Sequence, residues 1–197
     1  MEKRRKHILI IIGVLLVCAL LFFAWLTFIV PQIRTKRIVS AAKNGEVGDT
    51  IHFGDYEWQI LAKESNRVLI ITTSAVGELT YNDEYEKVTW EQCNLREWLN
   101  NTFYNEFSSD EKRLIADTQL ENKNNERYET YGGNATNDKI FLLSLEEANK
   151  YFSDDSERAI GKAWWLRSPG NYELCATFVY PDGKVSTSGC DVVCEGG

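Results

Sequence analysis

The stretch His7-ILIIIGVLLVCALLFFAWLTFI-Val30 divides this chain into two parts of different character. It contains no Asp, Glu, Lys or Arg. As an α-helix, its 24 residues extend about 36 Å, enough to cross a hydrocarbon core of about 30 Å. The run is longer than the apolar core of a cleaved secretory signal, and its end at Leu26–Val30 offers no small residue for cleavage. Residues 7–30 are therefore predicted to form an uncleaved transmembrane helix.

Basic residues flank this segment on both sides, so the charge rule for orientation discriminates only weakly. They are Lys3, Arg4, Arg5 and Lys6 before it, and Arg34, Lys36, Arg37 and Lys43 after it. The first four lie directly against the segment, which favours a cytoplasmic tail of residues 1–6 and a translocated C-terminal part. We expect a single-pass protein of the cell membrane, with residues 31–45 as a connector and residues 46–197 as an extracytoplasmic domain.

The part that follows the basic stretch is strongly acidic. Residues 38–197 contain 15 Lys and Arg against 28 Asp and Glu, a net charge of −13. Such a surface repels phosphate backbones, so nucleic acid is not expected as a partner. The only histidines are His7 and His52, too few for a multi-histidine metal site, and the common nucleotide, zinc and EF-hand motifs are missing. No catalytic residue, cofactor or metal site is predicted.

The acidic part begins with strands. Thr50–Gly54, Tyr56–Lys63 and Arg67–Thr73 are separated by short turn sequences. In the second of them apolar side chains alternate, which places Tyr56, Trp58, Ile60 and Ala62 on one face. A three-stranded antiparallel meander is the natural interpretation.

The middle of the chain has helical patterns, each preceded by a capping box. The three boxes are Thr89 with Gln92, Ser108 with Glu111, and Ser144 with Glu147. In the first helix an apolar stripe recurs at three- and four-residue steps, formed by Leu95, Trp98, Leu99, Phe103 and Phe107. The polar stretch Thr118–Lys139 is a long loop, of the kind that is functional or disordered.

Strand patterns return after this loop. Lys139–Ser144 is predicted to be a buried strand, and Ala163–Ser168 another. Leu174–Cys190 is predicted to be a hairpin that turns at Pro181–Gly183, where Pro presets φ and Gly accepts a positive φ. Strands, then helices, then strands again make an α+β domain.

Several stretches together resemble a bacterial family catalogued as domain of unknown function 6273. They are Gly48–Trp58, Tyr81–Tyr85, Thr89–Lys112, Gly132–Asn134, Asp138–Glu147 and Trp164–Gly170. The order of a Trp-rich WLRS strand and a Gly-turn hairpin also looks like C-type lectin-like folds, including formylglycine-generating enzymes. The first resemblance implies no activity, whereas the second implies an extracellular scaffold that presents a ligand site. Members of the family usually continue into a closing Gly-Val-Arg-Pro-Ala-Leu strand, which by this resemblance is missing after Gly197.

The sharpest local motif is Trp164–Gly170, for which two interpretations stay open. In one, Trp165 and Arg167 form part of a binding surface, since aromatic and guanidinium groups are favoured there. In the other, which is favoured, the tryptophans fill the core and Arg167 bonds loop carbonyls or an acid. Asn171 and Tyr172, just past the strand, are the better surface candidates.

Three cysteines lie in or near the final hairpin. With the turn at Pro181–Gly183, Cys175 lies within a residue or two of facing Cys190, so a disulfide between them is a candidate. By analogy with formylglycine-generating enzymes, Cys190 and Cys194 would instead be redox or copper-binding thiols. Two acidic clusters, residues 82–84 and 154–157, lack a recognisable calcium-ligand spacing and are interpreted as solvated loops.

These observations favour a membrane-anchored, extracytoplasmic module that binds an unidentified protein or carbohydrate. The alternative is a thiol- or metal-dependent modifying enzyme that uses Cys190 and Cys194.

Overall fold

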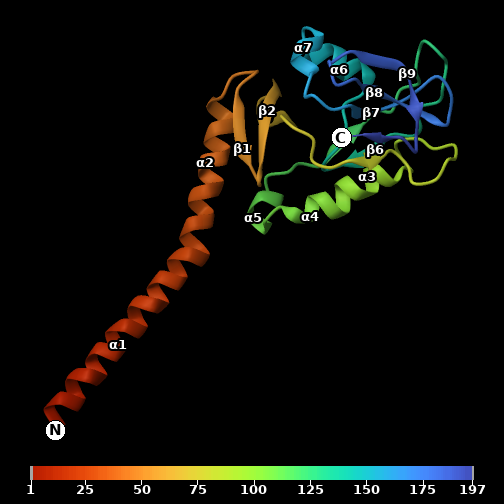
Figure 1. Ribbon diagram of the computed structural model, residues 1–197. Helices are drawn as coiled ribbons and strands as arrows, with labels where there is room; N and C mark the ends of the chain where they lie inside the picture. Colours follow the sequence, from red (N-terminus) through yellow and green to blue (C-terminus); the bar gives the residue numbers. More distant parts are fainter. Residues whose placement is uncertain (1, 197) are drawn as a thin grey trace. The chain divides into compact units, whose positions relative to one another are not determined.

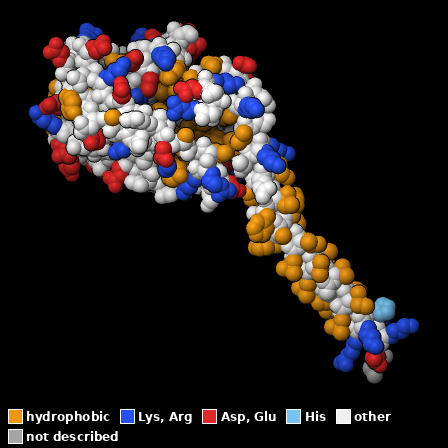
Figure 2. All heavy atoms as spheres, turned by 180° about the vertical axis from the view of Figure 1, so that it is seen from behind, with side chains coloured by type: hydrophobic (Ala, Val, Ile, Leu, Met, Phe, Trp, Pro, Cys, Tyr) orange, Lys and Arg blue, Asp and Glu red, His pale blue; other side chains and the backbone are white. Residues whose placement is uncertain are grey.

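The computed structural model describes residues 2–196, and the chain divides into two compact units at residues 44 and 45 (Figure 1). The first unit is a single helical rod formed by α1 (Glu2–Ala24), the π-helical segment η1 (Trp25–Ile29) and α2 (Val30–Asn44). Its apolar side chains cover the surface along most of its length, with a basic group at the N-terminal end (Figure 2). By length and composition this helix can cross a membrane, and it is the one such helix among residues 2–196. The expected connector therefore continues the helix rather than interrupting it.

The π-helical turn lies just before a proline. In η1 the N–H of Val30 donates to the carbonyl of Trp25, five residues earlier. Pro31 has no N–H with which to continue the ordinary ladder, so a locally widened turn is a natural way to accommodate it. The hydroxyl of Thr27 donates to the carbonyl of Phe23 at 2.9 Å, which gives a polar side chain in this apolar segment an internal partner.

The second unit begins with the predicted meander. Strands β1 (Thr50–Phe53), β2 (Tyr56–Lys63) and β3 (Val68–Thr72) form an antiparallel sheet in that order. Phe53 pairs with Tyr56 across the first turn, and the β2–β3 register shifts between Ile60 and Ala62. The three-stranded prediction is confirmed.

A second helical stretch crosses the middle of this unit. It consists of α3 (Asn94–Trp98), the π-helical η2 (Leu99–Phe103) and α4 (Tyr104–Glu106). Its N-cap is Cys93, whose sulfur accepts the N–H of Arg96, so the capping box predicted at Thr89 is wrong. Residues 89–93 instead form a tight turn, because the N–H groups of residues 92 and 93 both donate to the carbonyl of Thr89.

The other two predicted capping boxes are confirmed. Ser108 opens α5 (Ser109–Lys112) and Ser144 opens α6 (Leu145–Tyr151), each with the reciprocal glutamate bond. A further short helix, α7 (Asp155–Arg158), is capped by Asp154.

The last sheet is β7 (Trp164–Pro169), β8 (Cys175–Val179) and β9 (Val185–Asp191), antiparallel in that order. The predicted hairpin is confirmed, with Gly183 at φ +87° in its turn. A Cβ atom at Gly183 would lie 1.6 Å from the carbonyl oxygen of Asp155, so this turn requires glycine.

Two short ladders join distant parts of the unit. The first pairs β4 (Leu79–Thr80) with β10 (Glu195–Gly196), and the second pairs β5 (Thr118–Leu120) with β6 (Thr136–Asp138). The strand predicted at Lys139–Ser144 is wrong, because pairing ends at Asp138. The following residues form no strand, although the carbonyl of Leu143 accepts the N–H of Arg167 from β7.

Two apolar clusters hold these elements together. One lies where α6 packs on the β7–β8 sheet and the β2–β3 strands; its buried members are Leu61, Leu143, Ala148, Phe152, Trp164, Leu166 and Val179. The other is aromatic, and in it Phe103 and Phe107 of the middle helical stretch meet Phe53, Tyr56 and Trp58. The domain is α+β with antiparallel sheets, as expected; the lectin-like architecture stays a resemblance.

Candidate functional site

The structure places Trp165 and Arg167 inside the domain. Trp165 is buried, donates its indole N–H to the carbonyl of Leu79 at 3.1 Å, and meets the ring of Tyr81 edge to face. Arg167 is also buried, with its guanidinium paired to both carboxylate oxygens of Glu147 and bonded to the carbonyl of Leu142 at 2.8 Å. These contacts match the core interpretation, since neither side chain reaches a surface where it could bind a ligand.

The pair between Arg167 and Glu147 fixes α6 on β7. Partial burial acts to raise the pKa of Glu147, but the hydrogen bonds and charge of Arg167, helped by the N-cap Ser144, bring that pKa below its usual value. Glu147 thus closes the capping box and neutralises a buried guanidinium at the same time.

Asn171 and Tyr172 do lie on the surface, in the turn between β7 and β8. The N–H of Asn171 donates to the carbonyl of Ser188 and that of Cys175 to the carbonyl of Tyr172, so the turn is held at both ends. The Tyr172 side chain is 43% exposed. Of the four predicted binding residues, Tyr172 is the one that lines a hollow.

The hollow has a volume of about 430 Å³ and is open to solvent. Three loops form it, and its lining residues are Lys87, Glu129, Thr130, Tyr131, Tyr172, Glu173 and Leu174. The N–H of Val88 donates to the carbonyl of Glu173, and Lys87 forms an ion pair with the Glu173 carboxylate, so the first and third loops are joined directly. We call this feature the tyrosine hollow, because its two aromatic walls are Tyr131 and Tyr172.

The middle loop is anchored by Asn125. This residue is 2% exposed, and its amide nitrogen donates to the carbonyls of Pro169 at 2.9 Å and Thr187 at 3.0 Å. Its backbone pairs with Thr130, which closes residues 125–130 into a compact turn. The buried amide therefore fixes this loop against the β7–β9 sheet and keeps Tyr131 close to the Tyr172 turn.

Glu129 is held in an unusual backbone conformation. Its φ is +57°, the only positive φ of a non-glycine residue among residues 2–196. The N–H of Glu129 donates to the carbonyl of Asn125 at 2.7 Å, so the turn imposes this conformation. Strained backbone is concentrated at functional sites, and here it lies in the wall of the hollow.

The Tyr172 side chain is held in place by a hydrogen bond to Asp191, which also accepts a bond from a thiol. Its hydroxyl donates to Asp191 at 2.9 Å, and the thiol of Cys175 donates to the same oxygen at 3.4 Å. Hydrogen bonding to Cys175, Asp191 and Tyr85 raises the pKa of the Tyr172 phenol. Burial raises the pKa of the Cys175 thiol, which keeps it protonated and unreactive at neutral pH.

The predicted disulfide between Cys175 and Cys190 is not formed; the structure pairs Cys190 with Cys194, and Cys175 is free. A bulge at Gly189, where φ is +79°, sets the register so that Cys190 faces Ala176 and Cys175 faces Asp191. Side chains alternate between the faces of a sheet, so an offset of one residue points the two thiols away from each other. The disulfide takes up both sulfurs that the alternative enzyme would use.

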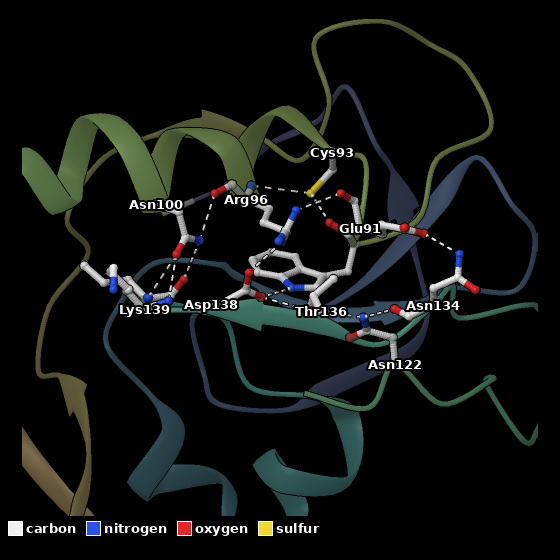
Figure 3. A network of polar contacts seen from close by, with 11 residues as sticks. Glu91, Cys93, Arg96, Asn100, Asn122, Asn134, Thr136, Asp138 and Lys139 are labelled. Carbon is white, nitrogen blue, oxygen red and sulfur yellow. Dashed lines mark hydrogen bonds and ion pairs between the residues drawn. The ribbon is translucent and has the colours of Figure 1, made fainter. Parts of the chain in front are cut away.

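The middle helical stretch and β6 are joined by a buried polar network that is structural in character (Figure 3). Asp138 is 1% exposed and accepts hydrogen bonds from Trp90 at 2.9 Å, Arg96 at 2.7 Å and Thr136 at 2.9 Å. Asn100 extends the network to the backbone of residues 139 and 140. Both carboxylate oxygens of Asp138 accept hydrogen bonds from within the fold, so its role is structural.

The two acidic clusters also serve local structure. At the start of α3 the side-chain oxygen of Asn82 accepts the N–H of Asn94, and the side-chain oxygen of Asn94 accepts the N–H of Asp83. Asp154 caps α7. Among residues 2–196, no group of three or more His, Cys, Asp or Glu side chains is arranged to hold a metal.

The sequence interpretation missed most of the hollow. It singled out Tyr172 and the polar stretch Thr118–Lys139, but not Tyr131, Glu129 or Lys87. The prediction of that stretch as a continuous loop is wrong at its ends, because Thr118–Leu120 and Thr136–Asp138 pair as β5 and β6. The loop's length was the available signal, since long loops in compact domains are often functional.

Comparison with known protein families identifies the family of this chain. The model for the family described as "Domain of unknown function (DUF6273)" matches residues 65–194. This is more than half of the chain, so the chain belongs to that family. No curated protein and no solved structure matches the chain.

Proposed function

We propose that this member of the DUF6273 family is a membrane-anchored, extracytoplasmic binding module whose ligand site is the tyrosine hollow. The observation that carries the proposal is the hollow itself, with two exposed aromatic walls on loops that Asn125 and Asp191 hold in place. Aromatic side chains that are already ordered lose little entropy when a ligand covers them, which favours binding. The apolar N-terminal helix supplies the anchor.

The chemistry of the hollow suits recognition better than catalysis. Tyrosine walls with an ion pair at the rim offer apolar contact and orientation, the combination typical of binding sites. The neighbouring thiol of Cys175 is protonated and hydrogen-bonded rather than poised as a nucleophile.

The topology is tested by labelling intact cells. Asn124 is exposed and lies in the loop that leads to the hollow. A cysteine introduced by Asn124→Cys should react with a membrane-impermeant maleimide in intact cells. The unaltered chain should react little, because Cys93 and Cys175 are buried and Cys190 and Cys194 are paired. The remaining cysteine, Cys18, is exposed but lies within the proposed membrane anchor, where such a reagent does not reach it. Labelling that requires lysis would place the domain in the cytoplasm and overturn this part of the proposal.

The binding site is tested by a ligand screen on the full chain in non-ionic detergent. A ligand present at 100 times its dissociation constant stabilises the folded state by about 2.7 kcal/mol, which corresponds to a rise in Tm of about 5–10 °C for a domain of this size. The rise should disappear in Tyr131→Ala and persist in Tyr180→Ala, a matched change at an exposed tyrosine outside the hollow. A ligand whose effect is insensitive to Tyr131 and Tyr172, or one that is turned over, would refute the assignment.

A further inference from the structure

We propose that the tyrosine hollow takes an alkylammonium group. This inference rests on the proposed function, because it names the ligand chemistry of the same site. Three observations carry it: the aromatic walls, the balance of charge in the lining, and the placement of Glu129.

The walls offer aromatic surface to solvent. Tyr131 is 53% exposed and Tyr172 is 43% exposed, so both rings have free surface. The face of an aromatic ring carries negative potential and attracts cations. Because the Tyr172 hydroxyl is tied to Asp191, its ring is already held in place when a ligand arrives.

The lining has one more negative than positive charge. Its charged residues are Glu129, Glu173 and Lys87. Lys87 pairs with Glu173, and among residues 2–196 the carboxylate of Glu129 takes part in no ion pair. An entering cation would therefore meet an uncompensated carboxylate, within a domain segment whose net charge is −13. An anionic ligand would be repelled by both.

Glu129 occupies a position whose backbone conformation is unfavourable for glutamate. Glycine and asparagine adopt φ near +57° more readily than glutamate, so a loop with only a structural task would be more stable with one of them. Keeping a carboxylate here is explained if its charge is used. A cation between the Glu129 carboxylate and the tyrosine faces would give that use.

The test compares matched probes by NMR on the full chain in non-ionic detergent, with isotope-labelled tyrosine rings. Choline and 3,3-dimethylbutan-1-ol have nearly the same shape and differ in charge. N-acetyl-lysine N-methylamide represents a peptide side chain. We expect choline or the lysine derivative to shift the Tyr131 and Tyr172 signals saturably, and the neutral alcohol to bind about three- to fivefold more weakly or not at all. The tighter of the two cations indicates whether the source is a free quaternary ammonium compound or a protein side chain.

Two variants distinguish the effect of the Glu129 carboxylate from the effect of the loop's overall negative charge. Glu129→Gln should weaken the binding of the cation at least about threefold. Glu126→Gln removes the same charge from the same loop outside the lining, so it should change the affinity for the cation little. Equal binding of choline and the neutral alcohol, equal effects of the two variants, or no saturable shift with either cation would overturn the inference. If a neutral ligand instead binds in a manner that depends on Tyr131, the cation inference fails while the proposed function stands.

Discussion

Replacement of Asp138 by alanine should strongly destabilise the domain. Asp138 is buried and accepts hydrogen bonds from Trp90, Arg96 and Thr136. Removing one partner of a buried ion pair costs about 3–5 kcal/mol, and each buried donor left without an acceptor costs about 1–3 kcal/mol. These penalties overlap, because Arg96 keeps a bond to the carbonyl of Glu91 and its side chain is 26% exposed.

We therefore expect Asp138→Ala to lower the free energy of unfolding by about 3–5 kcal/mol, which corresponds to a fall in Tm of about 6–20 °C. Tryptophan fluorescence during urea unfolding of the full chain in non-ionic detergent measures this, since Trp90 lies in the network itself. The matched control is Asp117→Ala, which breaks an ion pair to Lys139 at a carboxylate that is 69% exposed. Such a pair contributes less than about 1 kcal/mol.

Asp138→Asn gives an intermediate test, because it keeps the shape and one acceptor oxygen while removing the charge opposite Arg96. The reasoning is refuted if Asp138→Ala and Asp117→Ala unfold within about 1 kcal/mol of each other. That result would mean that the domain relaxes around the missing carboxylate, and that the network does not hold the middle helical stretch to β6.

Three further outcomes follow from the structure. The pKa of Glu147 is lowered in the folded state, so its pairing with Arg167 stabilises the domain above the unfolded-state pKa, and this contribution is lost as the pH falls through the folded-state pKa. In thermal melts from pH 7 to pH 3, the Tm of Glu147→Gln should therefore be lower than that of the unaltered chain at pH 7 and should fall less as the pH decreases. Replacing Cys190 and Cys194 together by serine should lower the free energy of unfolding by about 2 kcal/mol in a chemical denaturation series, the value for so short a loop, whereas an unchanged midpoint would show that the loop is already fixed by its other contacts. Asn125→Ala removes the amide donor from the carbonyls of Pro169 and Thr187 and should cost about 1–3 kcal/mol. It should also weaken the binding of any ligand in the hollow; binding that survives intact would show that the loop does not depend on this anchor.

The sequence alone determined the features that depend on neighbours along the chain. The helix that is long and apolar enough to cross a membrane follows from the uninterrupted apolar run at residues 7–30, because length and composition decide whether a helix can span a bilayer. The caps at Ser108 and Ser144 follow from residues three apart, and the first meander follows from alternation with short turns. The capping box predicted at Thr89 is wrong, because the helix begins four residues later, where the sulfur of Cys93 accepts the N–H of Arg96 and acts as the N-cap.

The tertiary structure decided everything that depends on register and on distant contacts. A bulge at Gly189 fixed which residue faces Cys175, and no rule based on the turn alone supplies that offset. The tyrosine hollow joins three loops whose residues, such as Lys87, Tyr131 and Tyr172, are more than 40 positions apart in sequence. Tyr131 lies near Tyr172 because the buried amide of Asn125 bonds carbonyls of β7 and β9, and the loop of Lys87 is joined to that of Tyr172 by the bond from Val88 to Glu173. Hydrogen bonds of this kind leave no periodic signal in the chain.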